Sequence, residues 1–136
     1  MKKILIADDD VALRKVLVEK FTKEGWGAVA AVDGEETLAE VTKDTFDIVL
    51  LDLRMPHKDG FEVLEELKSH PLNPPPVILV LSNSGDEEDI KRAISLGATD
   101  YFVKADDPLE KILKWATIYS GTNGVSAEEG KIPHRE

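Results

Sequence analysis

The feature of this chain that most constrains its fold is a regular alternation between short apolar runs and longer segments with helical spacing. Three runs, at residues 4–7, 48–51 and 77–81, are wholly apolar and rich in branched side chains. Continuous runs of this length are typical of parallel strands that are buried on both faces. Weaker runs at 28–32 and 101–103 predict two further strands nearer the edges of the same sheet.

The segments between the runs predict helices, at 11–24, at 35–43, from 59 onward, at 86–96 and from 107 onward. Asp59-Gly60-Phe61-Glu62 has the spacing of a capping box, and Gly97 has the position of a C-terminal cap. Asp10 and Asp107-Pro108 are residue types that commonly begin helices. Five strand–helix units with right-handed crossovers place helices on both faces of the sheet, which is the doubly wound α/β class.

Composition narrows the class of protein. The chain has 136 residues, which is the size of one domain. It contains no cysteine, so a disulfide scaffold, a thiolate zinc site and a cysteine nucleophile are excluded. Its 17 basic and 27 acidic residues give a net charge of −10, which disfavours nucleic acid and anionic membranes as direct partners. No apolar run is long enough to span a membrane and no secretory pattern follows Met1, so we expect a cytoplasmic protein.

The composition changes near the C-terminus. Residues 120–124 read Ser-Gly-Thr-Asn-Gly, a cluster typical of a break between elements. Beyond it only Val125 and Ile132 are sizeable apolar residues. We therefore expect a folded domain over residues 1–119 and a flexible tail over 120–136. A linker to a further domain is the alternative interpretation of that tail.

Polar residues follow the strands at the points where they end, namely Asp8-Asp9-Asp10, Asp52, Ser82 and Lys104. Ligands of open α/β sheets bind at the carboxyl ends of strands, where the strand order reverses. With the order 2-1-3-4-5, the first and third strands are central neighbours. In that case Asp8, Asp9 and Asp52 converge at the switch point.

Three clustered carboxylates repel one another, since two unit charges about 4 Å apart cost roughly 4 kcal/mol at an effective dielectric of 20. Such a cluster holds either protons or a cation, and Mg²⁺ binds through one or two carboxylates plus water. Each residue alone also has an ordinary interpretation: Asp10 as a helix cap, Ser82 as a turn residue and Lys104 as an exposed lysine. Their shared placement favours a site where a metal, a lysine and a hydroxyl surround an anionic group on a carboxylate.

The sequence resembles the receiver domain of two-component response regulators, the fold of the chemotaxis regulator. The resemblance covers residues 3–119 and rests on five motifs in order, at 4–10, 51–56, 59–60, 81–82 and 97–104. It implies a flavodoxin-like receiver fold with five parallel strands in the order 2-1-3-4-5. It also implies a phosphoacceptor signalling domain of a His-Asp phosphorelay rather than an enzyme, either a single-domain regulator or an isolated receiver domain.

The resemblance implies how the phosphoryl group and metal are bound. Asp52 matches the phosphoacceptor, which takes the phosphoryl group from a sensor histidine kinase or a phosphotransfer protein. Mg²⁺ or Mn²⁺ is then held by Asp9, by Asp52 and by the main-chain carbonyl of Arg54. Asp8 matches the carboxylate that acts on the metal through water, and Lys104 matches the lysine that pairs with the phosphoryl oxygens.

The resemblance also implies an output mechanism. Ser82 matches the switch hydroxyl that moves to the phosphoryl group, and Tyr101 matches the aromatic switch residue that turns inward after it. Together they would reshape the surface of the helix at 86–96, the strand at 101–103 and the last helix, where a protein partner or a second copy binds. On that last helix, Ile118 lies almost opposite the apolar face and Trp115 lies at its flank. Both are candidates for this surface, although single exposed apolar residues are common.

The sequence departs from the family pattern after Lys104, where Ala105 stands in place of a proline whose peptide bond is usually cis. Because a cis bond without proline costs about 3–4 kcal/mol, we expect the Lys104–Ala105 bond to be trans. Arg54 and Ser84 occupy variable positions beside the phosphoacceptor. They are expected to tune the lifetime of the acyl phosphate, in a direction the sequence leaves open.

Two other classes of function compete with this interpretation. An interaction module could keep the fold and never be phosphorylated, although the complete set of site residues disfavours it. A haloacid-dehalogenase phosphatase would need a second aspartate where Arg54 stands, and a flavodoxin would need a glycine-rich phosphate loop in place of residues 8–10. A histidine metal site is disfavoured because His57, His70 and His134 lack the spacing of metal ligands.

Overall fold

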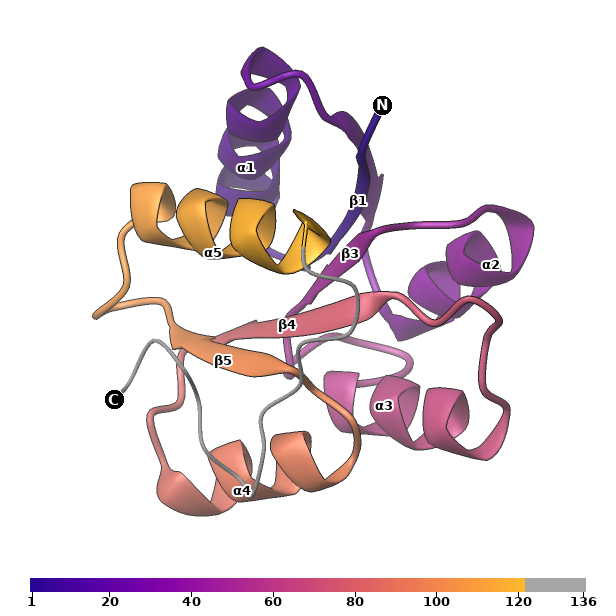
Figure 1. Ribbon diagram of the computed structural model, residues 1–136. Helices are drawn as coiled ribbons and strands as arrows, with labels where there is room; N and C mark the ends of the chain where they lie inside the picture. The colour runs from indigo at the N-terminus through magenta and orange to yellow at the C-terminus, as the bar shows by residue number, and fades with distance from the viewer. Residues whose placement is uncertain (122–136) are drawn as a thin grey trace.

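Strands and helices alternate along the whole of the chain that the computed structural model describes, residues 1–121 (Figure 1). The five strands are β1 (Lys3–Ala7), β2 (Gly27–Ala31), β3 (Ile48–Leu51), β4 (Val77–Ser82) and β5 (Asp100–Val103). The five helices are α1 (Val11–Lys23), α2 (Gly34–Lys43), α3 (Gly60–Ser69), α4 (Glu87–Ser95) and α5 (Leu109–Gly121). Every strand and helix predicted from the sequence is therefore confirmed.

The strands form one parallel sheet in the order β2-β1-β3-β4-β5, which confirms the predicted fold class. The register places the ends of the two central strands level, because Ala7 of β1 lies opposite Leu51 of β3. The ladder continues one step further, where the Asp52 N–H donates to the Ala7 carbonyl at 2.9 Å. The residues that follow β1 and β3 are consequently brought together at the switch point.

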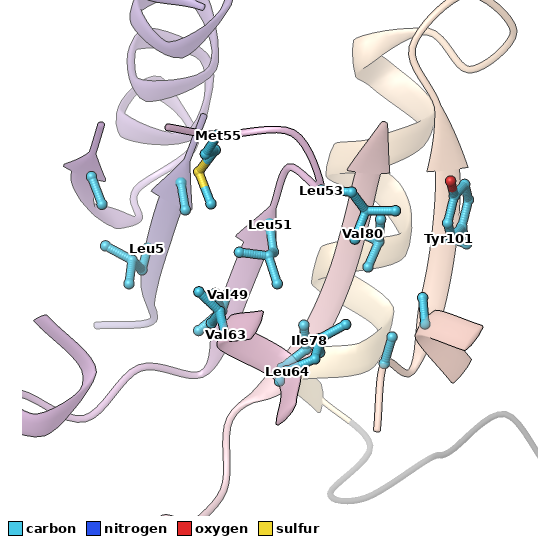
Figure 2. Packing of buried hydrophobic residues seen from close by; sticks show 14 of the residues in the cluster. Leu5, Val49, Leu51, Leu53, Met55, Val63, Leu64, Ile78, Val80 and Tyr101 are labelled. Atoms are coloured by element: carbon cyan, nitrogen blue, oxygen red, sulfur yellow. The ribbon is translucent and has the colours of Figure 1, made fainter. Parts of the chain in front are cut away.

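The sheet divides the apolar core into two clusters. Leu5 and Ala7 of β1 belong to the cluster under α2, α3 and α4, part of which Figure 2 shows. Ile4 and Ile6 belong to the cluster under α1 and α5. Since both faces of each central strand are covered, neighbouring residues are both buried, and this is the physical reason for the continuous apolar runs.

Side-chain caps fix where the helices begin and end. Asp10 accepts the Leu13 N–H, and Asp59 and Glu62 form the predicted capping box. Gly97 follows α4 with a left-handed φ of 109°, as expected of a helix-terminating glycine. The spacing of apolar residues in α1 predicts Val16 on the same buried face as Leu17 and Phe21. This prediction is wrong, because Val16 is 45% exposed.

The last helix runs further than the breaker cluster predicts. Helix α5 includes the first two residues of the expected tail, Ser120 and Gly121. The remaining residues of that prediction, 122–136, lie outside the described part of the chain. Within residues 1–121, no helix combines the length and apolar character needed to cross a membrane.

Candidate functional site

Three carboxylates meet at the carboxyl end of the sheet. One carboxylate oxygen from each of Asp8, Asp9 and Asp52 lies within 4.8 Å of the other two. The side chains of Asp8 and Asp52 are buried, with residues only 2% and 3% exposed, whereas Asp9 is exposed. The structure thus brings together the acidic residues predicted for the site and leaves one of them open to solvent.

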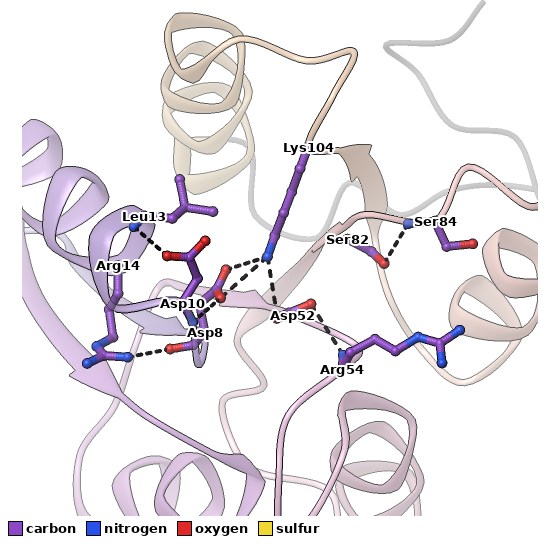
Figure 3. A network of polar contacts seen from close by, with 9 residues as sticks. All are labelled: Asp8, Asp10, Leu13, Arg14, Asp52, Arg54, Ser82, Ser84 and Lys104. Carbon is purple, nitrogen blue, oxygen red and sulfur yellow. Dashed lines mark hydrogen bonds and ion pairs between the residues drawn. The ribbon is translucent and has the colours of Figure 1, made fainter.

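Lys104 extends from the end of β5 across this cluster (Figure 3). Its Nζ lies 3.0 Å from Asp8 Oδ2 and 3.4 Å from Asp52 Oδ2, and its side chain is 13% exposed. The backbone sets its direction, because the Lys104 N–H donates to the Ser82 carbonyl at the end of β4. A single cation is therefore shared by two buried carboxylates.

Burial and charge shift the protonation of these groups. Burial, together with the negative charge of Asp8, raises the pKa of Asp52 to about 7, although Lys104 acts in the opposite direction. Burial would lower the pKa of Lys104, but the charges of Asp52 and Asp8 outweigh it and raise that pKa above its usual value. Lys104 therefore stays charged, while Asp52 holds a proton more readily than an ordinary aspartate.

One buried atom of this cluster lacks an aligned donor. Asp8 Oδ2 is buried and accepts no hydrogen bond among the described residues, although Lys104 Nζ lies 3.0 Å away. Buried oxygens without donors are costly, and a hard cation or its bound water would supply what this oxygen lacks. An all-oxygen set of three carboxylates is the ligand chemistry that Mg²⁺ and Mn²⁺ prefer. The residues therefore fit a divalent ion.

The two predicted switch residues contact a common neighbour. Ser82 Oγ is buried and accepts the Ser84 N–H at 3.1 Å. Tyr101 is fully buried, and its hydroxyl donates to the Ser84 carbonyl at 2.7 Å. The Ser84 hydroxyl in turn donates to Asp89 of α4 at 2.7 Å. Ser84 therefore connects Ser82, Tyr101 and the first turn of α4.

The main chain of Arg54 lies beside Asp52. Its N–H donates to Asp52 Oδ1 at 3.3 Å, while its side chain is exposed. Arg14, which the sequence motifs do not indicate, donates from its guanidinium to the Asp8 carbonyl at 2.8 Å. The sequence carries one signal for this contact, namely a cationic residue in the first turn of α1, close to the end of β1.

The loop after Lys104 is built without a cis bond. The only cis peptide within residues 1–121 is Asn73–Pro74, so the Lys104–Ala105 bond is trans, as predicted. A turn replaces the proline, in which the Asp106 and Asp107 N–H groups both donate to the Val103 carbonyl. The buried Asp107 carboxylate accepts the Val103 N–H at 2.7 Å and pairs with Lys111.

The doubly wound parallel sheet, with a carboxylate cluster and a lysine at its switch point, defines the class as a flavodoxin-like α/β domain whose acidic site is suited to a divalent ion. The sequence profile of the response regulator receiver domain matches residues 4–114. The chain therefore belongs to the receiver domain family of two-component response regulators.

Individual proteins support this membership. A probable transcriptional regulator, ycf27 of Guillardia theta, is 35% identical over 122 residues, which cover 90% of this chain and 47% of that protein. The receiver domain of the Francisella response regulator 1452 superposes with a TM-score of 0.84 at 25% identity, covering 91% of this chain and all of the other. Chemotaxis protein CheY4 of Vibrio cholerae superposes with a TM-score of 0.80 at 28% identity, covering 88% and 98%. The chain spans about half the length of the curated relatives it matches.

Proposed function

We propose that Asp52 is the phosphoacceptor of this receiver domain and that a divalent ion held by Asp9, Asp52 and the Arg54 carbonyl assists the reaction, with Asp8 acting through water. The observation that carries the proposal is the Asp8–Asp9–Asp52 cluster with Lys104 placed across it. Burying clustered carboxylates costs free energy unless a cation is bound beside them. The cluster therefore favours a site that binds a divalent ion.

The proposed step is a phosphoryl transfer to a carboxylate. An Asp52 oxygen forms a bond to phosphorus while the bond from phosphorus to the imidazole nitrogen of a phosphohistidine breaks, and the electron pair leaves with the imidazole. A bound divalent ion supplies positive charge against the transferring oxygens. Lys104 supplies the second positive charge, and its raised pKa keeps it protonated through the neutral range. The domain thus assists its own modification without being an enzyme that turns over a substrate.

We infer that Ser82 and Tyr101 transmit the change. A hydroxyl that turns toward a phosphoryl group on Asp52 gives up the Ser84 N–H that it now accepts. Tyr101 already donates to the carbonyl of the same residue, so the loop between β4 and α4 is linked to both switch positions. The phosphoryl group would carry roughly −1.5 to −2 charge in place of the charge of the Asp52 carboxylate, and its three acceptor oxygens would offer the loop new hydrogen-bond partners.

The partners follow from this mechanism. The phosphoryl donor would be a sensor histidine kinase or a phosphotransfer protein. The output would pass to a protein partner or a second copy at the α4–β5–α5 surface. On α5, Ile118 is 37% exposed and Trp115 is partly buried at the edge of the core, as predicted from the helical spacing.

The proposal is tested by incubating the protein with acetyl phosphate, with Mg²⁺ or with a chelator, and measuring intact mass. The parent should gain one phosphoryl group only with the metal, and Asp52→Asn should gain none. Asp10→Asn is the matched control, because Asn caps a helix as well as Asp and Asp10 serves as the cap of α1. Equal labelling of Asp52→Asn would overturn the assignment. An unlabelled parent would favour the interaction module that keeps the fold without being phosphorylated.

A further inference from the structure

The loop that follows the phosphoacceptor, residues 53–59 between β3 and α3, rests on the start of α2. His57 Nδ1 lies 2.7 Å from Asp33 Oδ2. Next to this contact, a β-carbon on Gly34 would lie 2.1 Å from the Lys58 carbonyl oxygen. The first residue of α2 is thus a glycine at a place where the loop backbone leaves no room for a side chain.

Asp33 is a fixed partner for the loop. Its carboxylate caps α2 by accepting the Glu36 N–H at 2.8 Å, and its carbonyl accepts the hydroxyl of the buried Thr37 at 2.7 Å. Its side chain is only 13% exposed. Because these bonds hold Asp33 in one place, its free oxygen presents a stationary acceptor to His57.

Unlike Asp33, His57 is largely exposed, and the Asp33 carboxylate is the acceptor that its side chain contacts. Its backbone is left-handed, with a φ of 67°, a conformation that costs a residue other than glycine about 1 kcal/mol. Its side chain is 66% exposed. The hydrogen bond and the charge of Asp33 raise its pKa, and the charge of Glu35 acts in the same direction. The contact therefore joins a restrained carboxylate to an imidazole that is partly in solvent.

The same loop carries the main chain of Arg54, whose N–H donates to Asp52 Oδ1 at 3.3 Å. The loop is held near β3 by the buried side chain of Met55 and by the Gly60 N–H, which donates to the Leu53 carbonyl at 3.0 Å. The Asp33–His57 contact adds an attachment on the far side, toward α2. A shift of the loop would move the Arg54 N–H and carbonyl relative to Asp52.

We propose that Asp33 and His57 are positioning residues, whose contact fixes the loop so that the Arg54 main chain is correctly placed against Asp52 and the divalent ion. The inference rests on the proposed function, because it assigns these residues to the metal site described there. The proposed role requires no direct contact between either residue and the carboxylate cluster. Both act through the backbone of the loop.

The test uses the 136-residue chain and its variants His57→Asn, Asp33→Asn and the double variant. Asparagine tolerates the left-handed backbone at position 57 and keeps the cap at position 33. Glu66→Gln is the matched control, since it removes the ion pair of the next loop residue, Lys58, without touching Asp33. Two quantities are measured: the Mg²⁺ dissociation constant by calorimetry, and the pKa of His57 by NMR titration of its imidazole.

Loss of a residue that orients a metal ligand typically weakens binding by about 10- to 100-fold. Since Arg54 is one ligand among several, we expect each single variant to weaken Mg²⁺ binding by about 5- to 10-fold, just below that range. The double variant should be no weaker than the worse single variant, because both remove the same contact. Glu66→Gln should bind Mg²⁺ like the parent. In Asp33→Asn, the pKa of His57 should fall toward the ordinary value of about 6.5.

The possible failures are distinguishable. If the parent binds Mg²⁺ and the variants bind it equally well, the positioning role is overturned while the proposed function stands. A pKa of His57 that is unchanged in Asp33→Asn would overturn the contact itself. If the parent binds no Mg²⁺, the metal part of the proposed function is wrong and this inference falls with it.

Discussion

At the scale of single residues, the site is defined by an imbalance of charge. Two buried carboxylates share one lysine, and Asp8 keeps a buried oxygen without an aligned donor. Burial of Asp52, together with the negative charge of Asp8, raises the pKa of Asp52 to about 7, because Lys104 only partly offsets these two effects. A proton on Asp52 and a divalent ion would each relieve the repulsion between the carboxylates, so proton and metal compete for one site.

This competition predicts how the metal-free protein responds to pH. A carboxyl whose pKa is higher in the folded than in the unfolded state contributes stability at low pH and loses it as pH rises through the folded pKa. The contribution of Asp52 should therefore disappear between about pH 4 and pH 7. Asp52→Asn removes this loss and should be more stable than the parent at pH 8 by up to about 4 kcal/mol, at about 1.4 kcal/mol for each pH step between the two pKa values, and similar near pH 4. Denaturant unfolding in the presence of a chelator measures it, and identical pH curves for the two proteins would contradict the account.

A second buried contact, far from the site, was absent from the sequence-based expectations. The Tyr119 hydroxyl donates to Asp100 Oδ2 at 2.6 Å, and both residues are buried. The start of β5 is thereby tied to the end of α5. Nothing in the local pattern indicates this bond, because its partners are 19 positions apart and Tyr119 reads as an ordinary apolar helix residue.

Tyr119→Phe should lower the free energy of unfolding by about 1.5–3 kcal/mol, the range for hydrogen bonds to charged groups. Thr117→Ala provides the control on the same helix, since its exposed hydroxyl donates only to the Leu113 carbonyl and its loss should cost less than about 0.5 kcal/mol. Urea unfolding of the parent and the two variants measures the free energy of unfolding that each substitution removes. Equal effects would show that the buried hydroxyl contributes no more than an exposed one.

At the scale of elements, the sequence predicts best where burial is two-sided. The apolar runs at 4–7, 48–51 and 77–81 became strands because helices cover both faces, and the strand ends then placed Asp52 and Lys104 correctly. The predictions fail where long-range packing decides. Val16 lies at the rim of the face that α1 buries through Leu17 and Phe21, so spacing alone could not exclude it from the core.

Loop contacts are the other class of feature that spacing could not reveal. His57 was considered only as a metal ligand and rejected for its spacing, yet it contacts Asp33, which is 24 positions earlier. Asp107 was expected simply to begin the last helix, and its carboxylate accepts the Val103 N–H within its own loop. The His57–Asp33 contact depends on how two loops meet at the end of the sheet, which requires the topology to be known first. The Asp107 contact depends on the backbone path of a single loop, which the spacing of apolar residues does not describe.

The α4–β5–α5 surface carries the prediction at this scale. Trp115 lies at the edge of the core, and Ile118 lies outside the buried face of α5. The variants Trp115→Ala and Ile118→Ser should therefore both fold and bind Mg²⁺ like the parent. Each should weaken, by about tenfold or more, the association induced by beryllofluoride, which mimics the phosphoryl group. Sedimentation and a pull-down with and without the mimic measure the effect. Folded variants that associate as well as the parent would place the output surface elsewhere.

At the scale of the whole molecule, the chain is a receiver domain that spans about half the length of the curated relatives it matches. Its net charge of −10 includes the carboxylates at the end of the sheet. Binding a divalent ion should therefore stabilise the entire domain, because the ion binds the folded state and the unfolded chain has no such cluster.

Mg²⁺ at about one hundred times its dissociation constant should stabilise the fold by roughly 2–3 kcal/mol, which raises the melting temperature by about 5–10 °C. In Asp9→Asn the metal-free melting temperature should rise, since one charge of the cluster is removed, and the increase caused by Mg²⁺ should shrink. Thermal unfolding with and without Mg²⁺ measures both effects. An unchanged response to Mg²⁺ in the variant would show that the ion binds at another place.

The central claim is that one carboxylate among the four aspartates at this end of the sheet accepts the phosphoryl group. Borohydride reduces an acyl phosphate to an alcohol, so the phosphorylated aspartate becomes homoserine and can be located by peptide mass spectrometry. After treatment with acetyl phosphate and Mg²⁺, the account predicts homoserine at position 52, with Asp8, Asp9 and Asp10 unchanged. Homoserine at any of those three positions, or at none of the four, would contradict it.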